Sequence, residues 1–349
     1  MTKNKKIAII GHFGSNKLFL DGQTIKTNEL YNELSLFADW DIKKVDTYYK
    51  SHNPLKLLID LFVALFTTKD IIILVAANGM KFFFPLLYFF ARFFNKRIYQ
   101  YVIGGSLDRR VKKYTNFKKY LNSFKVNWVE AVGMIDRLKD LGINNCELLY
   151  NFKRLTPISD DSISCYTSSP YRLCFFSRVM KEKGLEDAIE AIKTVNEKYG
   201  KTIYTLDIYG QIDPAQTEWF DNLKREFPQC IKYKGLVDYD KSVDVLKDYF
   251  ALIFPTLYYT EGVPGTIIDA YASALPIIAS KWENYDNIID DTTGISYTFG
   301  DVDDLIRVLM TISECPEIIN EKKQNCLNKV LCFRPEAVIK KITDKIESF

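Results

Sequence analysis

Two acidic residues eight positions apart, Glu261 and Asp269, flank a segment that is predicted to begin a helix at Pro264. The first N–H groups of a helix have no partner inside it and lie at the positive end of its dipole, so they attract phosphate. The two carboxylates could bind hydroxyl groups of a sugar or a ribose. The alternative is a plain loop followed by a helix with one acid on its face. The candidate binding residues of this segment are Glu261, Gly262, Gly265, Thr266, Ile267 and Asp269.

Two cations, Arg178 and Lys183, follow a predicted strand over 173–177. Cations at the carboxyl end of a strand can converge on one diphosphate, and a guanidinium group can bind two of its oxygens at once. Such charges stabilise the negative charge that develops as a diphosphate leaves. The alternative is a solvated turn in which Gly184 is the hinge.

Strands and helices alternate around these motifs at the spacing of parallel crossover units. This pattern predicts an α/β fold with doubly wound parallel sheets, which bind ligands at the carboxyl ends of their strands. In the first half we expect strands at 6–11, 71–76, 97–103, 126–132 and 146–150 and helices at 24–37 and 81–95. In the second half we expect strands at 173–177, 202–209, 231–234, 251–255 and 276–280 and helices at 185–199, 216–226, 240–248 and 264–274.

A domain boundary is predicted in the stretch 151–170, which is rich in Ser, Asp and Pro and has little periodicity. The charge changes sign there: residues 1–155 carry 25 Lys and Arg against 13 Asp and Glu, and residues 156–349 carry 22 against 31. We therefore expect a basic N-terminal domain and an acidic C-terminal one, each facing different partners. A last amphipathic helix follows. The predicted parts are 1–153, 154–334 and 335–349.

In this order the motifs resemble those of the retaining glycosyltransferases of family 4 (group 1), which have the GT-B fold. The resemblance rests on Arg178, the pair Lys183–Gly184, the two acids from Glu261 to Asp269, and the segments Ala270–Ser280, Leu206–Gly210 and Gly235–Val237. It implies two Rossmann-like domains that face a cleft. It also implies an acceptor-side N-terminal domain, a nucleotide-sugar-binding C-terminal domain, and a terminal helix 335–349 that packs back on the N-terminal domain.

The resemblance implies transfer of a sugar from a nucleotide-diphosphate sugar, of the UDP or GDP type, to an acceptor, with retention of the anomeric configuration. It assigns catalysis to Arg178 and Lys183 at the diphosphate and to Glu261 at the donor sugar. The implied donor-binding residues are Gly22, Gly210, Val237, Gly262, Gly265, Thr266, Ile267 and Asp269. The acceptor-side candidates are His12, Gly14, Gly104, Gly105 and Ser106.

Two positions depart from the family's pattern. The second acid is Asp269 instead of Glu, one methylene shorter, which affects its implied ribose contact. The histidine that many members carry after the strand 97–103 is absent, and the stretch 104–106 reads Gly-Gly-Ser. His12 is either a general base or a hydrogen-bonded loop residue.

Metal centres, disulfides and bound cofactors are not expected. Seven cysteines form no C-x-x-C pair, and the chain has two histidines, which favours a reducing compartment. The acids at 301, 303 and 304 precede a predicted helix and are interpreted as capping residues. We therefore predict a metal-independent enzyme, and the first residues lack the pattern of a signal peptide.

The basic half contains an aromatic stretch beside a polybasic one. Residues 82–94 include eight aromatic side chains, and 106–125 contain seven cations against one acid. The pattern indicates an interfacial anchor on an anionic membrane, and the alternative is a core crossover helix beside a solvated basic face. The uncharged run 82–91 has ten residues, too few for a membrane span. We expect a cytoplasmic protein, peripheral at the inner face of the plasma membrane, without a nucleic-acid partner.

By resemblance, the setting is bacterial polysaccharide biosynthesis, such as capsule or exopolysaccharide assembly, with a lipid-linked or growing saccharide as the acceptor. Two alternatives stay open. A GT-B nucleotide-sugar epimerase or hydrolase would act on its donor without an acceptor. A non-catalytic nucleotide-sugar-binding scaffold would bind the donor without turnover, and the intact Arg178, Lys183 and Glu261 argue against it.

Overall fold

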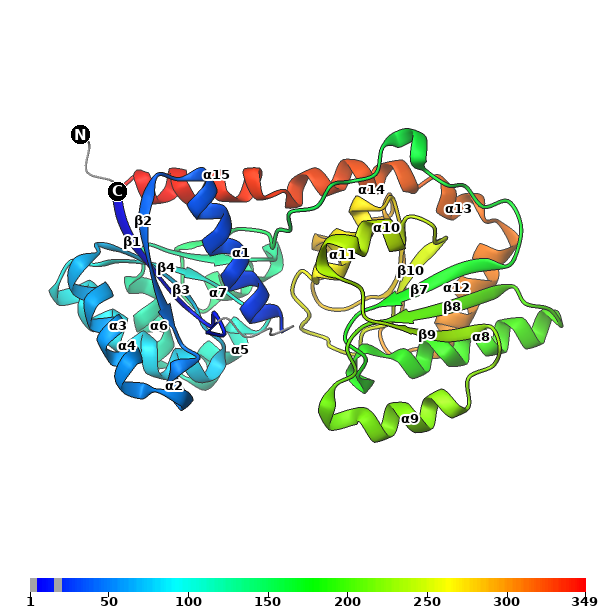
Figure 1. Cartoon of the computed structure of the whole chain (residues 1–349), viewed down its shortest axis with the longest axis horizontal. Coiled ribbons are helices and arrows are strands. Elements are labelled where there is room, and N and C mark those ends of the chain that lie inside the picture. The colour runs from blue at the N-terminus through cyan, green and yellow to red at the C-terminus, as the bar shows by residue number, and fades with distance from the viewer. Residues whose placement is uncertain (1–4, 16–20) are drawn as a thin grey trace. The chain divides into compact units, whose positions relative to one another are not determined.

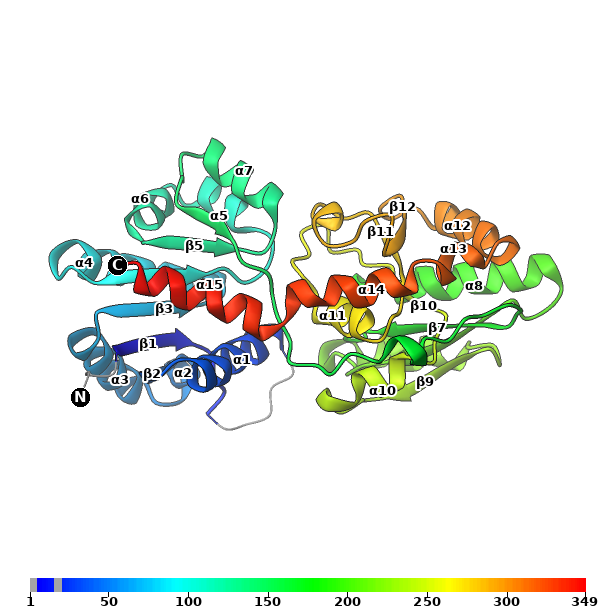
Figure 2. The same ribbon diagram turned by 90° about the horizontal axis from the view of Figure 1, so that it is seen from above.

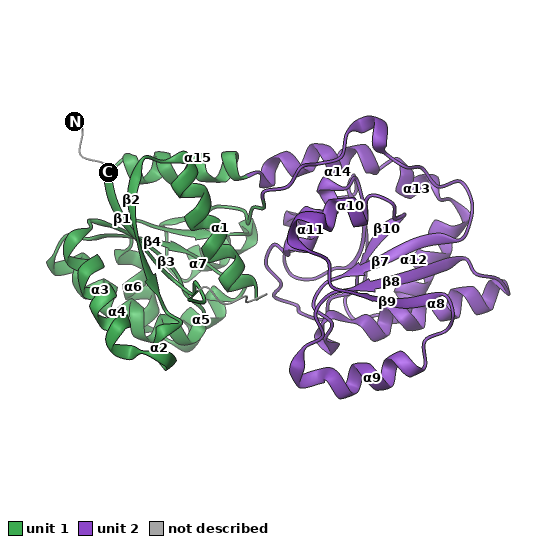
Figure 3. Cartoon of the chain, viewed as in Figure 1, with its two compact units in different colours: residues 1–153, 335–349 green, residues 154–334 purple. Residues whose placement is uncertain are grey.

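The computed structural model describes residues 5–15 and 21–349, so part of the polar loop between the first predicted strand and helix lies outside the described residues. The chain forms two compact units, one of residues 1–153 with 335–349 and one of residues 154–334 (Figures 1 and 3). Each unit is built on a six-stranded sheet whose paired strands are parallel. The predicted α/β fold of doubly wound parallel sheets is confirmed.

The sheet of unit 1 has the strand order β2-β1-β3-β4-β5-β6. The stretches 7–10 and 71–74 are wholly buried, as expected for parallel strands that are covered on both faces. The strands are β1 (Lys5–Gly11), β2 (Trp40–Asp46), β3 (Asp70–Leu74), β4 (Arg97–Tyr101), β5 (Val126–Val129) and β6 (Cys146–Leu148).

Helices cover both faces of this sheet (Figure 2). The side chains of Ile7 and Ile9 pack with α1 and α15, whereas those of Ala8 and Ile10 pack with α3 to α7. The helices of unit 1 are α1 (Gly22–Phe37), α2 (Tyr49–His52), α3 (Pro54–Thr67), α4 (Ala77–Phe93), α5 (Leu107–Lys113), α6 (Asn116–Ser123), α7 (Val132–Asp140) and α15 (Pro335–Glu347).

The sheet of unit 2 has the strand order β12-β11-β10-β7-β8-β9. The chain therefore builds three strands outward from β7 on one side and three outward from β10 on the other. The direction of winding reverses between β7 and β10. The strands are β7 (Tyr171–Phe176), β8 (Tyr204–Tyr209), β9 (Ile231–Gly235), β10 (Ala251–Phe254), β11 (Ile277–Ser280) and β12 (Gly294–Tyr297).

The helices of unit 2 also lie on two sides of its sheet (Figure 1). α8 and α12 pack on the face that carries Leu173 and Phe175 of β7. α10, α11 and α14 lie on the other side (Figure 1). The helices are α8 (Leu185–Tyr199), α9 (Thr217–Arg225), α10 (Ser242–Leu246), α11 (Gly265–Ala272), α12 (Val302–Glu314), α13 (Glu317–Asn320) and α14 (Lys323–Val330).

Each strand and helix predicted from the sequence is present, with small shifts at the ends. The capping interpretation of the acids at 301–304 is confirmed, because the Asp301 side chain accepts a hydrogen bond of 2.9 Å from the Asp304 N–H. The prediction omitted β2, β12 and several helices, among them α3. Across the described ranges, no helix is both long enough and apolar enough to cross a membrane.

The last helix, α15, completes the core of unit 1. Its four inward side chains are at most 2% exposed, and Lys5 Nζ donates a 2.7 Å hydrogen bond to its Ile346 carbonyl. The α15 side chains Val338, Ile339, Ile342 and Ile346 share one cluster with Ile7, Ile9, Leu30 and Leu34. The helix therefore covers a sheet face that would otherwise be exposed to water.

We expect Ile342→Ala to lower the free energy of unfolding of unit 1 by about 2–5 kcal/mol, because it leaves a cavity in this cluster. Chemical denaturation measures the loss, and hydrogen exchange followed by mass spectrometry should locate it in β1 and α1. The control is Lys341→Ala, an exposed position of the same helix. Faster exchange confined to unit 2 would contradict this placement of α15.

Candidate active site

The reversal of winding in unit 2 defines where a ligand-binding crevice forms. In a doubly wound sheet, the segments that follow the two central strands leave toward opposite faces, and the space between them opens at the strands' carboxyl ends. Here the two strands are β7 and β10. Arg178 and Lys183 follow β7, and Glu261 follows β10. The fold therefore brings the two motifs singled out in the sequence to one edge of the sheet.

An ion pair joins the two motifs. Lys183 Nζ lies 2.6 Å from Glu261 Oε2, and the two side chains are only 14% and 18% exposed. Thr256 donates a 3.2 Å hydrogen bond to the same carboxylate oxygen. The backbones are joined as well, because the Leu257 N–H donates to the Glu182 carbonyl at 2.9 Å. Lys183 and Glu261 are thus held side by side on two separate loops.

Two glycines allow the backbones to approach at this edge. Gly184 has a φ of 70°, and a Cβ atom built there would lie 1.8 Å from the carbonyl oxygen of Pro255. Gly210, after β8, has a φ of 140°, and its Cβ would lie 1.8 Å from the carbonyl oxygen of Ser177. Any side chain at either position would push the loops apart, so glycine is required by both space and dihedral angle.

Arg178 is the more exposed cation of the edge. Its side chain is 41% exposed, and Nη1 lies 3.8 Å from Asp213 Oδ2, a weak and solvated contact. Tyr258 lies near the same charges: its ring centroid is 5.3 Å from Lys183 Nζ. Burial first, and then Glu182 and Glu261, raise the pKa of the Tyr258 phenol, while Arg178 lowers it. Arg178 and Lys183 thus both act electrostatically on the surroundings of Tyr258.

The helix predicted to bind phosphate is α11. Gly265 is its first residue, and the preceding Pro264 supplies no capping side chain. The Ile267 N–H donates to the Pro264 carbonyl at 3.1 Å, which leaves the earlier amides at Gly265 and Thr266 as the better candidates for a ligand. Gly262 lies in the loop before the helix, and Asn284 Nδ2 fixes that loop by donating to the Glu261 carbonyl at 2.8 Å.

The second acid, Asp269, is turned into unit 2. The residue is 2% exposed, and its Oδ1 accepts a 2.6 Å hydrogen bond from the Ser242 hydroxyl of α10. Val237 is half-buried in the loop after β9, and the Gly210 N–H donates to the Gly235 carbonyl at 2.9 Å. Gly210 and Val237 therefore belong to the neighbouring strand ends of the same sheet.

The other predicted site residues belong to unit 1. His12 Nδ1 lies 2.6 Å from the Thr24 hydroxyl, which itself donates to Asp21 at 2.6 Å. Because Thr24 has one proton, Nδ1–H of His12 is the donor in the first bond. Gly14 and Gly104 have φ values of 80° and 76°. Gly22 begins α1, Gly104 and Gly105 form a bend, and Ser106 is the N-cap residue of α5.

Sequence reasoning missed several residues that support these loops. Thr256 and Tyr258 lie just before the motif that begins at Glu261, and nothing in the sequence distinguishes them from their neighbours. Asn284 and Ser242 act over long chain separations, so no local pattern could identify them. The sequence also gave no sign of the ion pair between Lys26 and Glu130 in unit 1.

Lys26 and Glu130 are both buried in unit 1. Lys26 Nζ also donates to the Val102 carbonyl at 3.1 Å and lies 3.6 Å from the centroid of the Tyr101 ring. Burial lowers the pKa of Lys26, and Glu130 opposes that effect. The pair satisfies two charges that would otherwise be costly inside the protein, and Lys26 also anchors the backbone at Val102, directly after β4.

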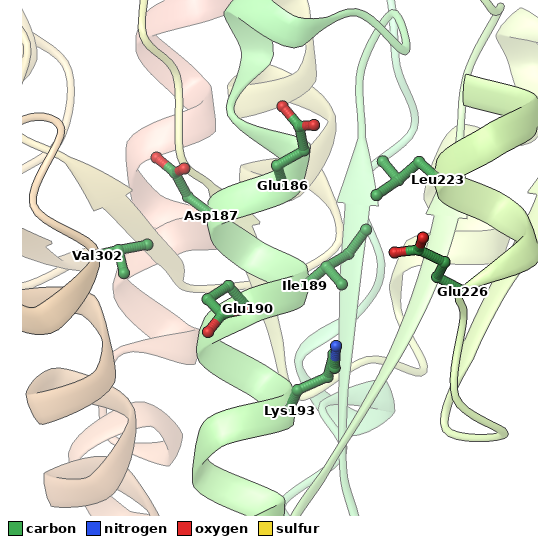
Figure 4. Close-up of a pocket in the computed structure, with 8 residues that line it drawn as sticks. All are labelled: Glu186, Asp187, Ile189, Glu190, Lys193, Leu223, Glu226 and Val302. Carbon is green, nitrogen blue, oxygen red and sulfur yellow. The ribbon is translucent and has the colours of Figure 1, made fainter. Parts of the chain in front are cut away.

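A surface pocket lies elsewhere in unit 2, along α8 between the end of α9 and the start of α12 (Figure 4). Its lining is unsuited to a diphosphate because its carboxylates outnumber its single cation. Burial raises the pKa of one of them, Asp187. The lining residues are Glu186, Asp187, Ile189, Glu190, Lys193, Leu223, Glu226 and Val302. Within residues 5–15 and 21–349, no three His, Cys, Asp or Glu side chains are grouped closely enough to hold a metal ion.

Two solved structures share the arrangement of sheets and helices described above. HepE of Anabaena, solved with UDP and glucose, has a TM-score of 0.73 and 12% identity over 99% of this chain and 100% of its own. Sucrose-phosphate synthase of Thermosynechococcus elongatus has a TM-score of 0.78 and 14% identity over 99% of each chain. The fold is that of the GT-B glycosyltransferases, as the sequence predicted.

The sequence comparison assigns the family. Residues 170–343 match the family model described as glycosyl transferases group 1. This segment of the chain belongs to that family. The amylovoran biosynthesis glycosyltransferase AmsK of Erwinia amylovora is 25% identical over 151 residues, 42% of this chain and 36% of AmsK. The match thus spans little more than a third of that relative.

We expect Gly184→Ala to destabilise unit 2 more than Gly200→Ala does. Gly200 has a φ of 62° with no atom near its would-be Cβ, so it isolates the dihedral strain of about 1–2 kcal/mol. Gly184 adds the clash with Pro255. Chemical denaturation of both variants measures the difference, with Gly265→Ala, which has open space, as the control. Equal losses at 184 and 200 would contradict the close approach.

Proposed function

We propose that the chain transfers a sugar from a nucleotide-diphosphate sugar to an acceptor, with retention of the anomeric configuration. The observation that carries the proposal is the Lys183–Glu261 pair at the carboxyl ends of β7 and β10, together with Arg178, which follows the same strand as Lys183. The family match of residues 170–343 supports it. HepE, which shares the fold, was solved with UDP and glucose.

The cations act on the leaving group. In the proposal, the diphosphate binds between Arg178 and Lys183, whose charges offset the negative charge that grows as the sugar–phosphate bond breaks. The amides at the start of α11 contribute to the same anion, since they are at the positive end of the helix dipole. The leaving diphosphate assists attack on the same face, so no protein nucleophile is needed.

Glu261 binds hydroxyl groups of the donor sugar. Its Oε2 accepts a 2.6 Å hydrogen bond from Lys183 Nζ. The residue that binds the sugar and the residue that binds the diphosphate are therefore also bonded to each other. Val237 would contact the base. Asp269 would bind the ribose, with a ribose hydroxyl replacing the Ser242 hydroxyl as the donor to its carboxylate. The remaining proposed donor residues are Gly22, Gly210, Gly262, Gly265, Thr266 and Ile267.

The acceptor is proposed to be a lipid-linked or growing saccharide in bacterial polysaccharide assembly. AmsK is named for the biosynthesis of amylovoran, which is consistent with capsule or exopolysaccharide formation. The acceptor-side candidates are His12, Gly14, Gly104, Gly105 and Ser106. We also propose that the donor carries UDP or GDP and that no bound cofactor is required. The proposed location is the cytoplasm, with the protein peripheral at the plasma membrane.

A panel of nucleotide sugars tests this function. A donor at 100 times its dissociation constant should stabilise the protein by about 2.7 kcal/mol, which thermal unfolding detects. The donor found in this way is then incubated with lipid-linked saccharides, and the anomeric configuration of the product is determined by NMR. A retained configuration supports the proposal. An epimer formed without acceptor, or binding without turnover, would contradict it.

We expect Lys183→Ala to lower kcat by about 10²–10³-fold and to change donor affinity less, because its charge acts on the departing diphosphate. Steady-state kinetics and calorimetric titration with the donor separate the two effects. Lys181→Ala, an exposed lysine two positions earlier, is the matched control. A Lys183→Ala variant with the kcat of the wild type would refute the assignment.

We expect turnover to persist in EDTA. In the proposal, Arg178 and Lys183 supply the positive charge that a divalent ion supplies in other phosphate-transfer sites. The rate of nucleoside diphosphate release is measured with EDTA and after adding Mg²⁺ or Mn²⁺. If turnover is lost in EDTA and restored by either ion, metal independence is wrong.

A further inference from the structure

The outward face of α3 is apolar along its whole length. A surface helix normally turns polar side chains to water and keeps its apolar stripe for the core. α3 has such an inner stripe in Leu57, Leu61 and Leu65, but its outer side is apolar too. Six outer side chains are 43–67% exposed: Leu55, Leu58, Ile59, Phe62, Val63 and Phe66.

This surface continues onto α4. The Phe66 ring lies 5.8 Å from that of Phe90 and 6.2 Å from that of Phe94, so the two helices share one layer of aromatic rings. We call the exposed large apolar side chains of the two helices, together with Phe94 directly after α4, the α3–α4 face. It consists of the six α3 residues with Phe82, Phe89, Phe93 and Phe94.

The size of the α3–α4 face is unusual. It holds ten of the twenty large apolar side chains that are exposed in the described parts of the chain. Monomeric soluble proteins rarely expose apolar patches larger than a few hundred Å², and larger ones mark interaction sites. Scattered exposure cannot explain such a concentration on two adjacent helices.

The charges around this face are almost all positive. Asp60 is the single acid on the two helices, and Lys56 neutralises it at 2.7 Å. Beyond this pair, the exposed cations on or beside the helices are Lys50, Lys69, Lys81 and Arg92. A second copy of this chain would bring the same cations together across a symmetric contact, which is unfavourable. An anionic surface is the complementary partner.

A basic pocket adjoins the face where α4 meets the α5–α6 turn. Lys81 Nζ and Lys113 Nζ lie 4.9 Å and 5.7 Å from the ring centroid of Tyr114. Lys81 immediately precedes Phe82, and Pro85 lies on the exposed side of α4 between Phe82 and Phe89. The pocket is lined by Lys81, Pro85, Lys113, Tyr114, Thr115, Asn116, Phe117 and Tyr120. Two lysines and a phenol suit the phosphate of a lipid headgroup.

We infer that the α3–α4 face inserts into the interfacial layer of an anionic lipid bilayer, and that the Lys81–Lys113 pocket binds a headgroup phosphate. Apolar and aromatic side chains on a helix face with cations at its border are the features of interfacial helices. The inference deepens the membrane association proposed above by naming the surface, and α3 is its new part. It does not depend on the transfer reaction.

The test is co-sedimentation of the full chain with vesicles of phosphatidylcholine or of equimolar phosphatidylcholine and phosphatidylglycerol. We expect binding to the anionic vesicles and at least about ten-fold weaker binding by a Leu55→Gln, Phe62→Gln variant, since each buried side chain contributes. Lys81→Gln with Lys113→Gln should weaken binding by about five-fold per lysine. The matched control is Leu36→Gln with Leu331→Gln, two exposed leucines elsewhere.

Insertion itself has a separate readout. Phe62→Trp should gain fluorescence quenching by brominated lipids in anionic vesicles, whereas Leu36→Trp should not. Nucleotide binding by the Leu55→Gln, Phe62→Gln variant should equal that of the wild type, which separates this inference from the proposed transfer. If the Leu55→Gln, Phe62→Gln variant binds anionic vesicles as tightly as the wild type, the α3–α4 face is not the membrane-binding surface, although the protein does associate with membranes. Absence of wild-type binding, or self-association that the variant abolishes, would overturn the inference as well.

Discussion

The reversal of strand order between β7 and β10 is the constraint on which the candidate site depends. Parallel strands end at one edge of a sheet, and the reversal opens the crevice there at those two strands alone. The backbone contact at Gly184 then sets the distance between the loops that follow them. A Cβ there would collide with the Pro255 carbonyl, so only glycine lets Lys183 reach Glu261.

The cations Arg178 and Lys183 at the strand edge of unit 2 lie in a part of the chain that is negatively charged overall. Residues 156–349 carry more acids than bases, so the average field of this half repels an anionic donor. In the proposal, the attraction for the donor therefore comes from contacts with individual side chains at the strand edge. In the proposed complex, Arg178 is the exposed cation that the diphosphate meets first, whereas Lys183, which is paired with Glu261, is shared with the ligand. The pair keeps Lys183 positioned and limits the cost of burying its charge.

Much of the fold was predictable because it follows from local patterns. Buried parallel strands are short apolar runs, and helices such as 185–199 show their amphipathic period directly. The edge strand β2, with the sequence WDIKKVD, lacks that signal because four of its seven residues are charged. The exposed apolar face of α3 could not be predicted either, because the sequence alone does not show which apolar residues are buried. An apolar stripe in a sequence predicts burial, and only the structure shows that two stripes of α3 point to opposite sides.

The candidate site was predictable to the level of its motifs. Arg178, Lys183 and Glu261 stand at strand ends that the alternation of elements identifies. Asn284, which fixes the Glu261 loop, and Ser242, which binds Asp269, lie more than twenty residues from their partners in the chain. Such contacts depend on packing between helices and loops, which spacing in the sequence does not specify.

The central claim is that the edge formed by Arg178, Lys183 and Glu261 binds a diphosphate. Calorimetric titration of the wild type with the diphosphates and monophosphates of uridine and guanosine tests it most directly. The account predicts that, for the base that binds, the diphosphate binds at least about ten-fold more tightly than the monophosphate, since the second phosphate gains charge-assisted hydrogen bonds. It also predicts that Arg178→Ala with Lys183→Ala removes this difference. Equal affinity for the diphosphate and the monophosphate, or a difference that survives in the double variant, would contradict it.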